Sequence, residues 1–230
     1  SAASDVYKRQ KMVEEGYDAE YAKAVVSYLA ISIDNVAEKN NSISRWANTK
    51  ETIAGSFSRQ ALPMVWDYFE SNPFSGSTGD WLNSIKYNLN VIRHCSNNRP
   101  KPAAVTQFSA TSLPYSDNYF DAVFTDPPYY DNVPYSYLSD FFYVWLKRSI
   151  GDLYPDLFAT PLTPKSKEIV AYTIDRSWEE AKEFFEENLK KSFQEIYRVL
   201  KPNGVATIVY THKSTSGWEA LINSLLDSDL

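Results

Sequence analysis

Apolar side chains recur at helical spacing in two stretches of the first hundred residues. Asp18 and Asp80 stand where these stretches begin, and an aspartate there accepts hydrogen bonds from the first free amides of a helix. We expect the first helix to run to about Glu38. Residues 41–75 are irregular, with a short helical stretch expected around Ala61–Glu70. The expected apolar faces are Tyr21, Val25, Leu29 and Val36 in the first helix, and Trp81, Ile85, Leu89 and Ile92 in the second.

Short apolar runs typical of strands follow after residue 100. Ala103–Phe108 is expected to be a short strand and Ser116–Asn118 a turn. Phe120–Thr125 (FDAVFT) is a continuous apolar run of the kind that is buried in parallel sheets. The sequence KPNG over Lys201–Gly204 is expected to end a helix and lead into another strand over Val205–Thr211.

Helices are expected between and after these strands. Ser139–Arg148 is one, and residues 150–176 after it should form a long loop. Ser177 and Glu180 have the spacing of a capping box, which predicts a helix from there to Leu200. A last helix is expected over Gly217–Leu226. Strand, helix and strand in this order favour an α/β fold with a mostly parallel sheet. The side chains expected to point inward from the capping-box helix are Trp178, Phe185, Phe193 and Ile196.

Both ends of the chain have the character of a fragment. Residues 1–10 show no periodicity and are interpreted as non-native sequence. The last residues stop inside an apolar periodic segment without a capping glycine. We therefore divide the chain into residues 1–10, a helical and irregular segment over residues 11–100, and a partial α/β domain over residues 101–230.

Composition narrows the class of protein. The chain has 230 residues, a net charge of −6, 43% hydrophobic and 23% charged residues, as a soluble globular protein does. No apolar run is long enough to span a membrane and no secretory signal is recognised, so we expect a cytoplasmic protein without a membrane partner. Cys95 is the single cysteine, which excludes an intramolecular disulfide and a cysteine zinc site in this sequence. The acidic balance argues against a free-standing nucleic-acid-binding module.

The tetrapeptide Asp126-Pro127-Pro128-Tyr129 directly follows the predicted FDAVFT strand, where ligands bind in open α/β sheets. The amine of a nucleobase is a poor nucleophile because its lone pair is delocalised into the ring. The Asp126 carboxylate and the Pro127 carbonyl can accept both of its N–H groups and so expose the lone pair. Pro128 restricts the backbone before it and brings no competing donor. Tyr129 offers a flat face to an extruded base. The alternative is a structural turn, because Asp-Pro-Pro also occurs without a catalytic role.

The chain resembles the large zinc-ribbon-containing adenine-specific DNA methylases, a family of amino-methyltransferases that use S-adenosylmethionine. The resemblance rests on DPPYYDNVPYSYLSDFFYVWLKR over residues 126–148, on SATSLP before it, and on RVLKPNGVATIVYTHKSTSGWEAL after it. It implies a Rossmann-like class I methyltransferase fold, incomplete at both ends, with an α-helical N-terminal segment. Residues 101–230 would then be a partial catalytic domain, and residues 11–100 a substrate-recognition insert.

The same resemblance implies the activity and the ligands. The expected reaction is methyl transfer from S-adenosylmethionine to adenine N6 of DNA, with Asp126, Pro127, Pro128 and Tyr129 as the catalytic motif. Ser109 and Ala110, expected at the end of the preceding strand, would bind the cofactor together with Asp126. The family's G-x-G loop and zinc ribbon have no counterpart in this sequence, and no metal site is expected. Relatives of this kind occur in restriction or phage-defence systems, which implies partner proteins from such systems.

Polar and aromatic residues near the motif are candidates for nucleic-acid binding, although packing or a solvated surface explains each of them as well. These candidates are Tyr130, Asn132, Tyr135, Tyr137, Lys165, Lys167, His212 and Lys213. A second group, from the irregular N-terminal stretch, mixes cations with an aromatic side chain: Arg45, Trp46, Lys50 and Arg59.

Other functions stay open at this point. DPPY motifs also occur in RNA methyltransferases that act on base amines, and the motif does not separate adenine N6 from cytosine N4. A non-catalytic scaffold that binds nucleic acid is a further alternative.

Overall fold

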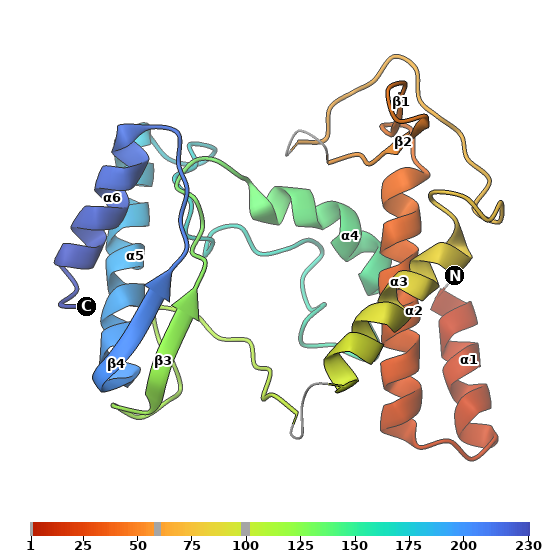
Figure 1. Cartoon of the computed structure of the whole chain (residues 1–230), viewed down its shortest axis with the longest axis horizontal. Coiled ribbons are helices and arrows are strands. Elements are labelled where there is room, and N and C mark those ends of the chain that lie inside the picture. The colour runs from red at the N-terminus through yellow and green to blue at the C-terminus, as the bar shows by residue number, and fades with distance from the viewer. Residues whose placement is uncertain (1, 58–60, 98–101) are drawn as a thin grey trace. The chain divides into compact units, whose positions relative to one another are not determined.

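The computed structural model describes residues 2–57, 61–97 and 102–230, with side chains from Tyr7 onward. The chain divides into two compact units. Unit 1 comprises Ser1–Pro102 and Tyr135–Lys165, and unit 2 comprises Ala103–Pro134 and Ser166–Leu230. Six helices and four strands lie within the described residues (Figure 1). The chain thus has the mixed helices and small sheets expected of the α/β class. The long segment Tyr135–Lys165 belongs to unit 1, although its neighbours on both sides belong to unit 2.

Unit 1 is built around one long helix, α2. The other helices of this unit pack against α2, and a short antiparallel hairpin completes it. The Asp18 side chain caps α2 by accepting from the amides of Glu20 and Tyr21, as predicted. The elements of unit 1 are α1 (Ala2–Glu14), α2 (Ala19–Lys39), β1 (Arg45–Ala47), β2 (Thr52–Ala54), α3 (Trp81–Asn97) and α4 (Tyr135–Ile150).

The buried face of α2 is rotated from the predicted one. Ala22, Val26 and Ala30 are buried, whereas Tyr21 is 57% exposed. Helix α2 carries apolar residues around most of its circumference, so spacing alone did not select the face. Small side chains at the contact allow neighbouring helices to approach closely, which favours the alanine face.

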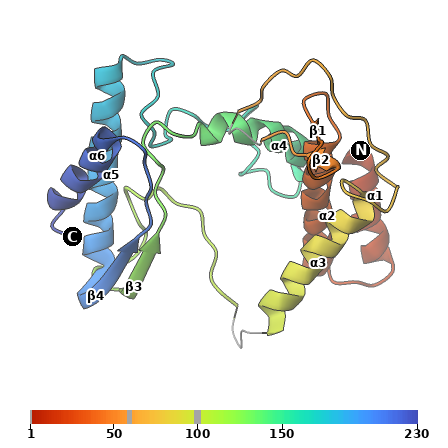
Figure 2. The ribbon, with the colours of Figure 1, turned by 45° about the horizontal axis from the view of Figure 1, so that its top comes forward.

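Unit 2 contains a parallel strand pair covered on one face by two helices (Figure 2). Its elements are β3 (Phe120–Thr125), α5 (Trp178–Val199), β4 (Leu200–Ile208) and α6 (Thr215–Leu226). The predicted strand at Phe120–Thr125, the Ser177–Glu180 capping box and the last helix are confirmed. The core joins both helices to the sheet through Phe185, Leu189, Phe193, Ile196, Ala220 and Leu221. Trp178 was predicted to point inward but is 43% exposed at the first turn of α5.

A bulge in β4 replaces the predicted turn at Lys201–Gly204. Strand β4 begins at Leu200, directly after α5, and Phe120 pairs with Leu200 whereas Ala122 pairs with Val205. The residues between Leu200 and Val205 therefore leave the ladder and return to it. Asn203 adopts a φ of 68°, a conformation that asparagine tolerates better than most residues. The turn residues were recognised correctly, but their place inside a strand was not.

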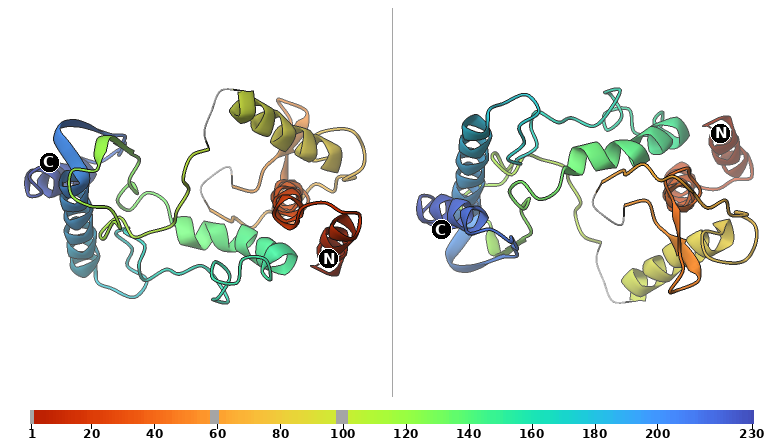
Figure 3. Two further views of the ribbon diagram at one scale, coloured as in Figure 1. Left: turned by 90° about the horizontal axis from the view of Figure 1, so that it is seen from below. Right: turned by 90° about the horizontal axis from the view of Figure 1, so that it is seen from above.

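The second face of the unit 2 sheet is open, unlike the buried strand expected from FDAVFT. Phe124 is 74% exposed and Val205 is 62% exposed, and both point away from α5 and α6. Figure 3 shows from below and from above that both helices of this unit lie on the same side of the strand pair. Sequence pattern could not reveal this, because an apolar run does not say how many layers cover it.

Two local predictions are wrong. Ala103–Phe108 forms no strand and its side chains are exposed, so it gains no partner for its backbone. Ala61–Glu70 forms no helix. Residues 2–10 belong to α1 (Ala2–Glu14), which packs on α2. Within the described residues, no helix combines the length and the apolar character needed to cross a bilayer.

Candidate functional site

The Asp126–Tyr129 motif lies at the carboxyl end of β3, beside the carboxyl end of β4. The two strands run in the same direction (Figure 1), and the amide of Val209 still donates to the Thr125 carbonyl at 2.9 Å. Asp126 is exposed, and Pro127, Pro128 and Tyr129 are partly buried. The peptide bonds before both prolines are trans. The structure thus presents a carboxylate at a sheet edge on a backbone stiffened by two prolines.

A tight reversal follows the motif. The Tyr130 amide donates to the Pro128 carbonyl at 3.1 Å, and the Asn132 amide donates to the Tyr129 carbonyl at 2.9 Å. Tyr130 has a φ of 52°, a strained conformation for a bulky residue. This turn sends the Tyr130 side chain inward while Asp126 stays at the surface.

Tyr130 is a core residue and not part of a surface for nucleic acid. It is 1% exposed, and its ring makes edge contacts with Phe185 and Trp178. Its hydroxyl has no hydrogen-bond partner among the residues that the structure describes, and burial raises its pKa. The prediction that Tyr130 contacts a ligand is therefore wrong, because the reversal at positive φ buries the ring.

His212 lies at the carboxyl end of β4 and is tied to the loop after the motif. Its side chain is 2% exposed, and its Nε2 lies 3.0 Å from Asp131 Oδ1. The Ser214 amide donates to His212 Nδ1 at 3.1 Å. Since Nδ1 accepts, the hydrogen bonds assign the proton to Nε2, which donates to the Asp131 carboxylate. The expectation of direct ligand contact does not fit a ring that is covered in this way.

Ser214, His212 and Asp131 have the residue types of a hydrolytic triad, but the geometry assigns them another role. The Ser214 hydroxyl lies 2.9 Å from His212 Nδ1 and also accepts from the Gly217 amide, as the cap of α6. The Ser214 amide occupies the same nitrogen. A histidine whose accepting nitrogen is held by a backbone amide is poorly placed to take a proton from a nucleophile.

The start of α6 also supports Tyr129. The Tyr210 hydroxyl donates to the Gly217 carbonyl at 3.0 Å, and its ring makes an edge contact with the Tyr129 ring at 5.5 Å. Gly217 leaves room for the imidazole, because a Cβ there would lie 2.3 Å from His212 Nδ1. Sequence reasoning did not assign roles to Tyr210 and Gly217. The signal was a glycine in the first turn of a helix, where alanine has the higher helix propensity.

The remaining nucleic-acid candidates are distributed over both units. Asn132, Lys167 and Lys213 belong to unit 2, where Lys167 and Lys213 are exposed. Tyr135, Tyr137 and Lys165 belong to unit 1, and both tyrosines lie in α4 instead of the expected loop.

Lys165 forms an ion pair within unit 1. Its ammonium lies 2.7 Å from Asp140 Oδ2 and 5.0 Å from the centre of the Tyr137 ring. Asp140 accepts from Lys165 and Thr163, which holds its pKa below the usual value despite burial. A lysine in this arrangement anchors its loop to α4, so a phosphate contact would have to displace an ion pair.

The second candidate group lies in unit 1. Arg45 and Trp46 belong to β1, and Trp46 stacks on Phe69 with 4.9 Å between ring centres. Lys50 is exposed in the turn between β1 and β2. Arg59 lies outside the described residues.

Ser109 and Ala110 do not form a cradle for S-adenosylmethionine. They follow no strand, both are exposed, and the Ser109 hydroxyl lies 2.8 Å from that of Thr111. The expected place at a strand end is wrong because Ala103–Phe108 finds no strand partner. These residues do not fit the cofactor that the resemblance implies.

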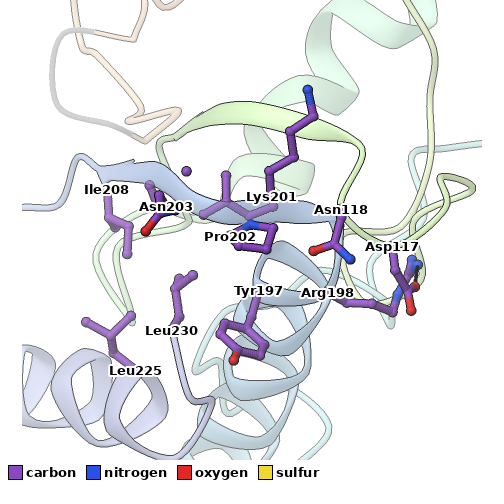
Figure 4. Close-up of a pocket in the computed structure, with 13 residues that line it drawn as sticks. Asp117, Asn118, Tyr197, Arg198, Lys201, Pro202, Asn203, Ile208, Leu225 and Leu230 are labelled. Atoms are coloured by element: carbon purple, nitrogen blue, oxygen red, sulfur yellow. Dashed lines mark hydrogen bonds and ion pairs between the residues drawn. The ribbon is translucent and has the colours of Figure 1, made fainter.

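A cavity of about 750 Å³ lies along β4, around its bulge. Figure 4 shows Leu225 and Leu230 on one side of it, and Ile208 and Pro202 on the strand side. Arg198 reaches its rim, but the guanidinium is held by Glu195 and Asp117 at 2.8 Å each. The cavity extends along β4 to Ile208, the last residue of that strand, but its lining includes none of the residues Asp126–Tyr129.

Among the side chains that the structure describes, no three of His, Cys, Asp or Glu come together as metal ligands would. No protein-family model matches the chain, and comparisons with curated proteins and with solved structures find no match. The function therefore has to be argued from the geometry of the sheet edge.

Proposed function

We propose that this chain carries the acceptor site of a base-amine methyltransferase, with adenine N6 of DNA as the acceptor. The observation that supports this most is the exposed Asp126 carboxylate on a trans Pro127-Pro128 backbone at the carboxyl end of a parallel strand. On this proposal, β3 and β4 belong to the sheet of a Rossmann-like methyltransferase fold, and α5 belongs to the helices that cover it.

Asp126 and Pro127 would orient the amine. The Asp126 carboxylate accepts one N–H group and the Pro127 carbonyl accepts the other, which favours a pyramidal nitrogen with an exposed lone pair. The two prolines lower the conformational freedom that the site loses when the base binds. Their missing N–H groups leave no backbone donor that would compete with the amine.

Tyr129 would hold the ring of the base. Its own ring is steadied by the edge contact with Tyr210, and Tyr210 is held in turn by the Gly217 carbonyl. Stacking of a base on an aromatic side chain contributes about 1–3 kcal/mol, comparable to the cost of taking a base out of a stack.

The role proposed for this chain is limited to binding and orienting the amine. Ser109 and Ala110 do not fit S-adenosylmethionine, so Asp126 and its neighbours are assigned no contact with the methyl donor.

The first experiment tests amine recognition without the methyl donor. Two short single-stranded DNA oligonucleotides differ in one base, which is adenine in one and N6,N6-dimethyladenine in the other. The dimethyl base has no N–H group for Asp126. We expect the full chain to bind the adenine strand about 5- to 100-fold more tightly, equivalent to about 1–3 kcal/mol for the hydrogen bonds, and Asp126→Ala to abolish this preference.

Asp121→Ala is the matched control, because Asp121 is an exposed aspartate of β3, the strand that leads into the motif, and pairs with Lys201 at 2.7 Å. Equal affinity of the unmodified chain for the two strands would contradict the proposal. RNA strands of the same sequence, and strands with cytosine or N4,N4-dimethylcytosine, identify the acceptor. Binding of every strand without regard to its amine would favour a non-catalytic scaffold.

A further inference from the structure

The His212 imidazole is built into the sheet edge as a hydrogen-bonded spacer. One nitrogen accepts from the Ser214 amide at the start of α6, and the other donates to Asp131 in the loop after the motif. The ring is covered by the protein, and its edge contact with Tyr130 spans 5.7 Å between ring centres. The imidazole ring therefore links the start of α6 to the loop after the motif.

The loop that it holds is strained. Tyr130 combines a positive φ with a hydroxyl that is buried and has no hydrogen-bond partner in the described ranges of the chain. Each of these features costs free energy, so the conformation persists only where surrounding contacts enforce it. The contacts present are the core packing of the Tyr130 ring, the Ala171 amide that donates to the Tyr130 carbonyl at 3.1 Å, and the His212–Asp131 hydrogen bond on the adjacent residue.

We propose that His212 is a positioning residue for the amine-binding motif: through Asp131 it fixes the reversal at Tyr130 and thereby the orientation of Asp126 and Pro127. This inference rests on the proposed function for its purpose, but the conformational link is a property of the loop and is measured without a ligand. His212 contacts no reacting atom in this role.

Two conservative substitutions separate the two hydrogen bonds of the ring. In His212→Gln, the side-chain amide nitrogen takes the place of Nε2 and still donates to Asp131. In His212→Asn, the side-chain oxygen takes the place of Nδ1 and still accepts from Ser214, but the donor to Asp131 is lost. A role confined to capping α6 would make the Gln variant the impaired one.

The decisive measurement is amide hydrogen exchange by NMR on the full chain. We expect the amides of Tyr130 and Asn132 to exchange at least about tenfold faster in His212→Asn, with little change in His212→Gln and in the amides of α5. Unchanged exchange in His212→Asn, or faster exchange throughout unit 2 in both variants, would overturn the proposal.

A second pair of variants tests whether the faster exchange comes from loss of the His212–Asp131 hydrogen bond or from a general effect of substitution at position 212. Asp131→Ala removes the acceptor of the hydrogen bond from Nε2 and should reproduce the fast exchange, whereas Ser214→Ala keeps the backbone donor to Nδ1 and should not. Fast exchange in Ser214→Ala alone would assign the effect to the cap of α6 and refute the link.

The adenine and N6,N6-dimethyladenine strands then test whether the His212–Asp131 hydrogen bond contributes to recognition of the amine. His212→Asn should reduce the preference for adenine over N6,N6-dimethyladenine to less than about one third of its normal value, and His212→Gln should restore it. A full preference in His212→Asn would refute the positioning role while the proposed function stands. If the unmodified chain shows no preference, the proposed function fails, and the exchange result still decides whether His212 holds the loop.

Discussion

At the edge of the unit 2 sheet, two residues that are close in the sequence have different environments. Asp126 is exposed, and Tyr130, four positions later, is 1% exposed in the core. The prolines between them restrict the backbone, and the positive φ of Tyr130 turns it inward. The buried Tyr130 thus anchors the backbone near Asp126, whose own exposed side chain makes little packing contact.

Asp34 in unit 1 shows the cost of burying a carboxyl group. It is 9% exposed, its Oδ1 has no hydrogen-bond partner within the described part of the chain, and burial raises its pKa to about 7. The folded state therefore holds a proton that the unfolded chain releases near pH 4. This contribution to stability is fully present below about pH 4 and is lost as the pH rises toward 7.

Asp34→Asn should remove this pH dependence. We expect the variant to be more stable than the unmodified chain at pH 8, by about 1–3 kcal/mol, and to show a flatter profile between pH 4 and pH 7. Urea unfolding at a series of pH values measures both. Parallel pH profiles for the two proteins would show that Asp34 does not titrate in this range.

At the scale of elements, helix α5 organises unit 2 because it contacts both the sheet and the segment that leads into β3. Its apolar face packs on the strands, and its last turns bind the segment that leads into β3. Arg198 donates to Glu195, Asp117 and the carbonyls of Leu113 and Tyr115. This clamp lowers the pKa of Glu195 to about 2, chiefly through the hydrogen bond from Arg198.

The hydrogen bonds between Arg198 and Glu195 predict that the free energy of unfolding falls at acidic pH. Glu195 is favoured as a carboxylate in the folded state, so its contribution is present above about pH 4.5 and is lost as the pH falls toward 2. Glu195→Gln should lower the free energy of unfolding at pH 7 by about 1–3 kcal/mol. Glu187→Gln, on the same helix and paired with Lys191 at 3.6 Å in solvent, should cost less than about 0.5 kcal/mol. Equal costs for both variants in denaturant unfolding would refute the clamp.

At the scale of the whole molecule, the chain divides into two compact units, and we expect the residues of each unit to unfold together. The chain crosses between the units near residues 102, 134 and 165. Unit 2 places its core under one face of the β3–β4 pair and leaves Phe124 on the other. Phe185 and Phe124 belong to the same unit but differ sharply in burial, so substitutions at these two positions can be compared directly.

Phe185→Ala should destabilise unit 2 by about 3–5 kcal/mol, because Phe185 is fully buried between α5, α6 and the sheet. Phe124→Ala should cost less than about 1 kcal/mol, because its ring is 74% exposed. Hydrogen exchange should show the loss of protection in α5 and α6 for Phe185→Ala, with α2 unchanged. Loss of protection in α2 as well would mean that the units unfold as one.

The sequence by itself determined the local features: the Asp18 cap, the capping box at Ser177 and Glu180, the strand at Phe120–Thr125 and the motif that follows it. These depend on residues within a few positions of one another, so spacing and side-chain chemistry are sufficient. Only the tertiary structure decided which face of α2 is buried, that Ala103–Phe108 lacks a strand partner, and that Tyr130 and His212 turn inward. Each of these depends on contacts with segments far along the chain, such as Asp131 with His212, and no local pattern encodes which of several apolar or polar positions will find its partner.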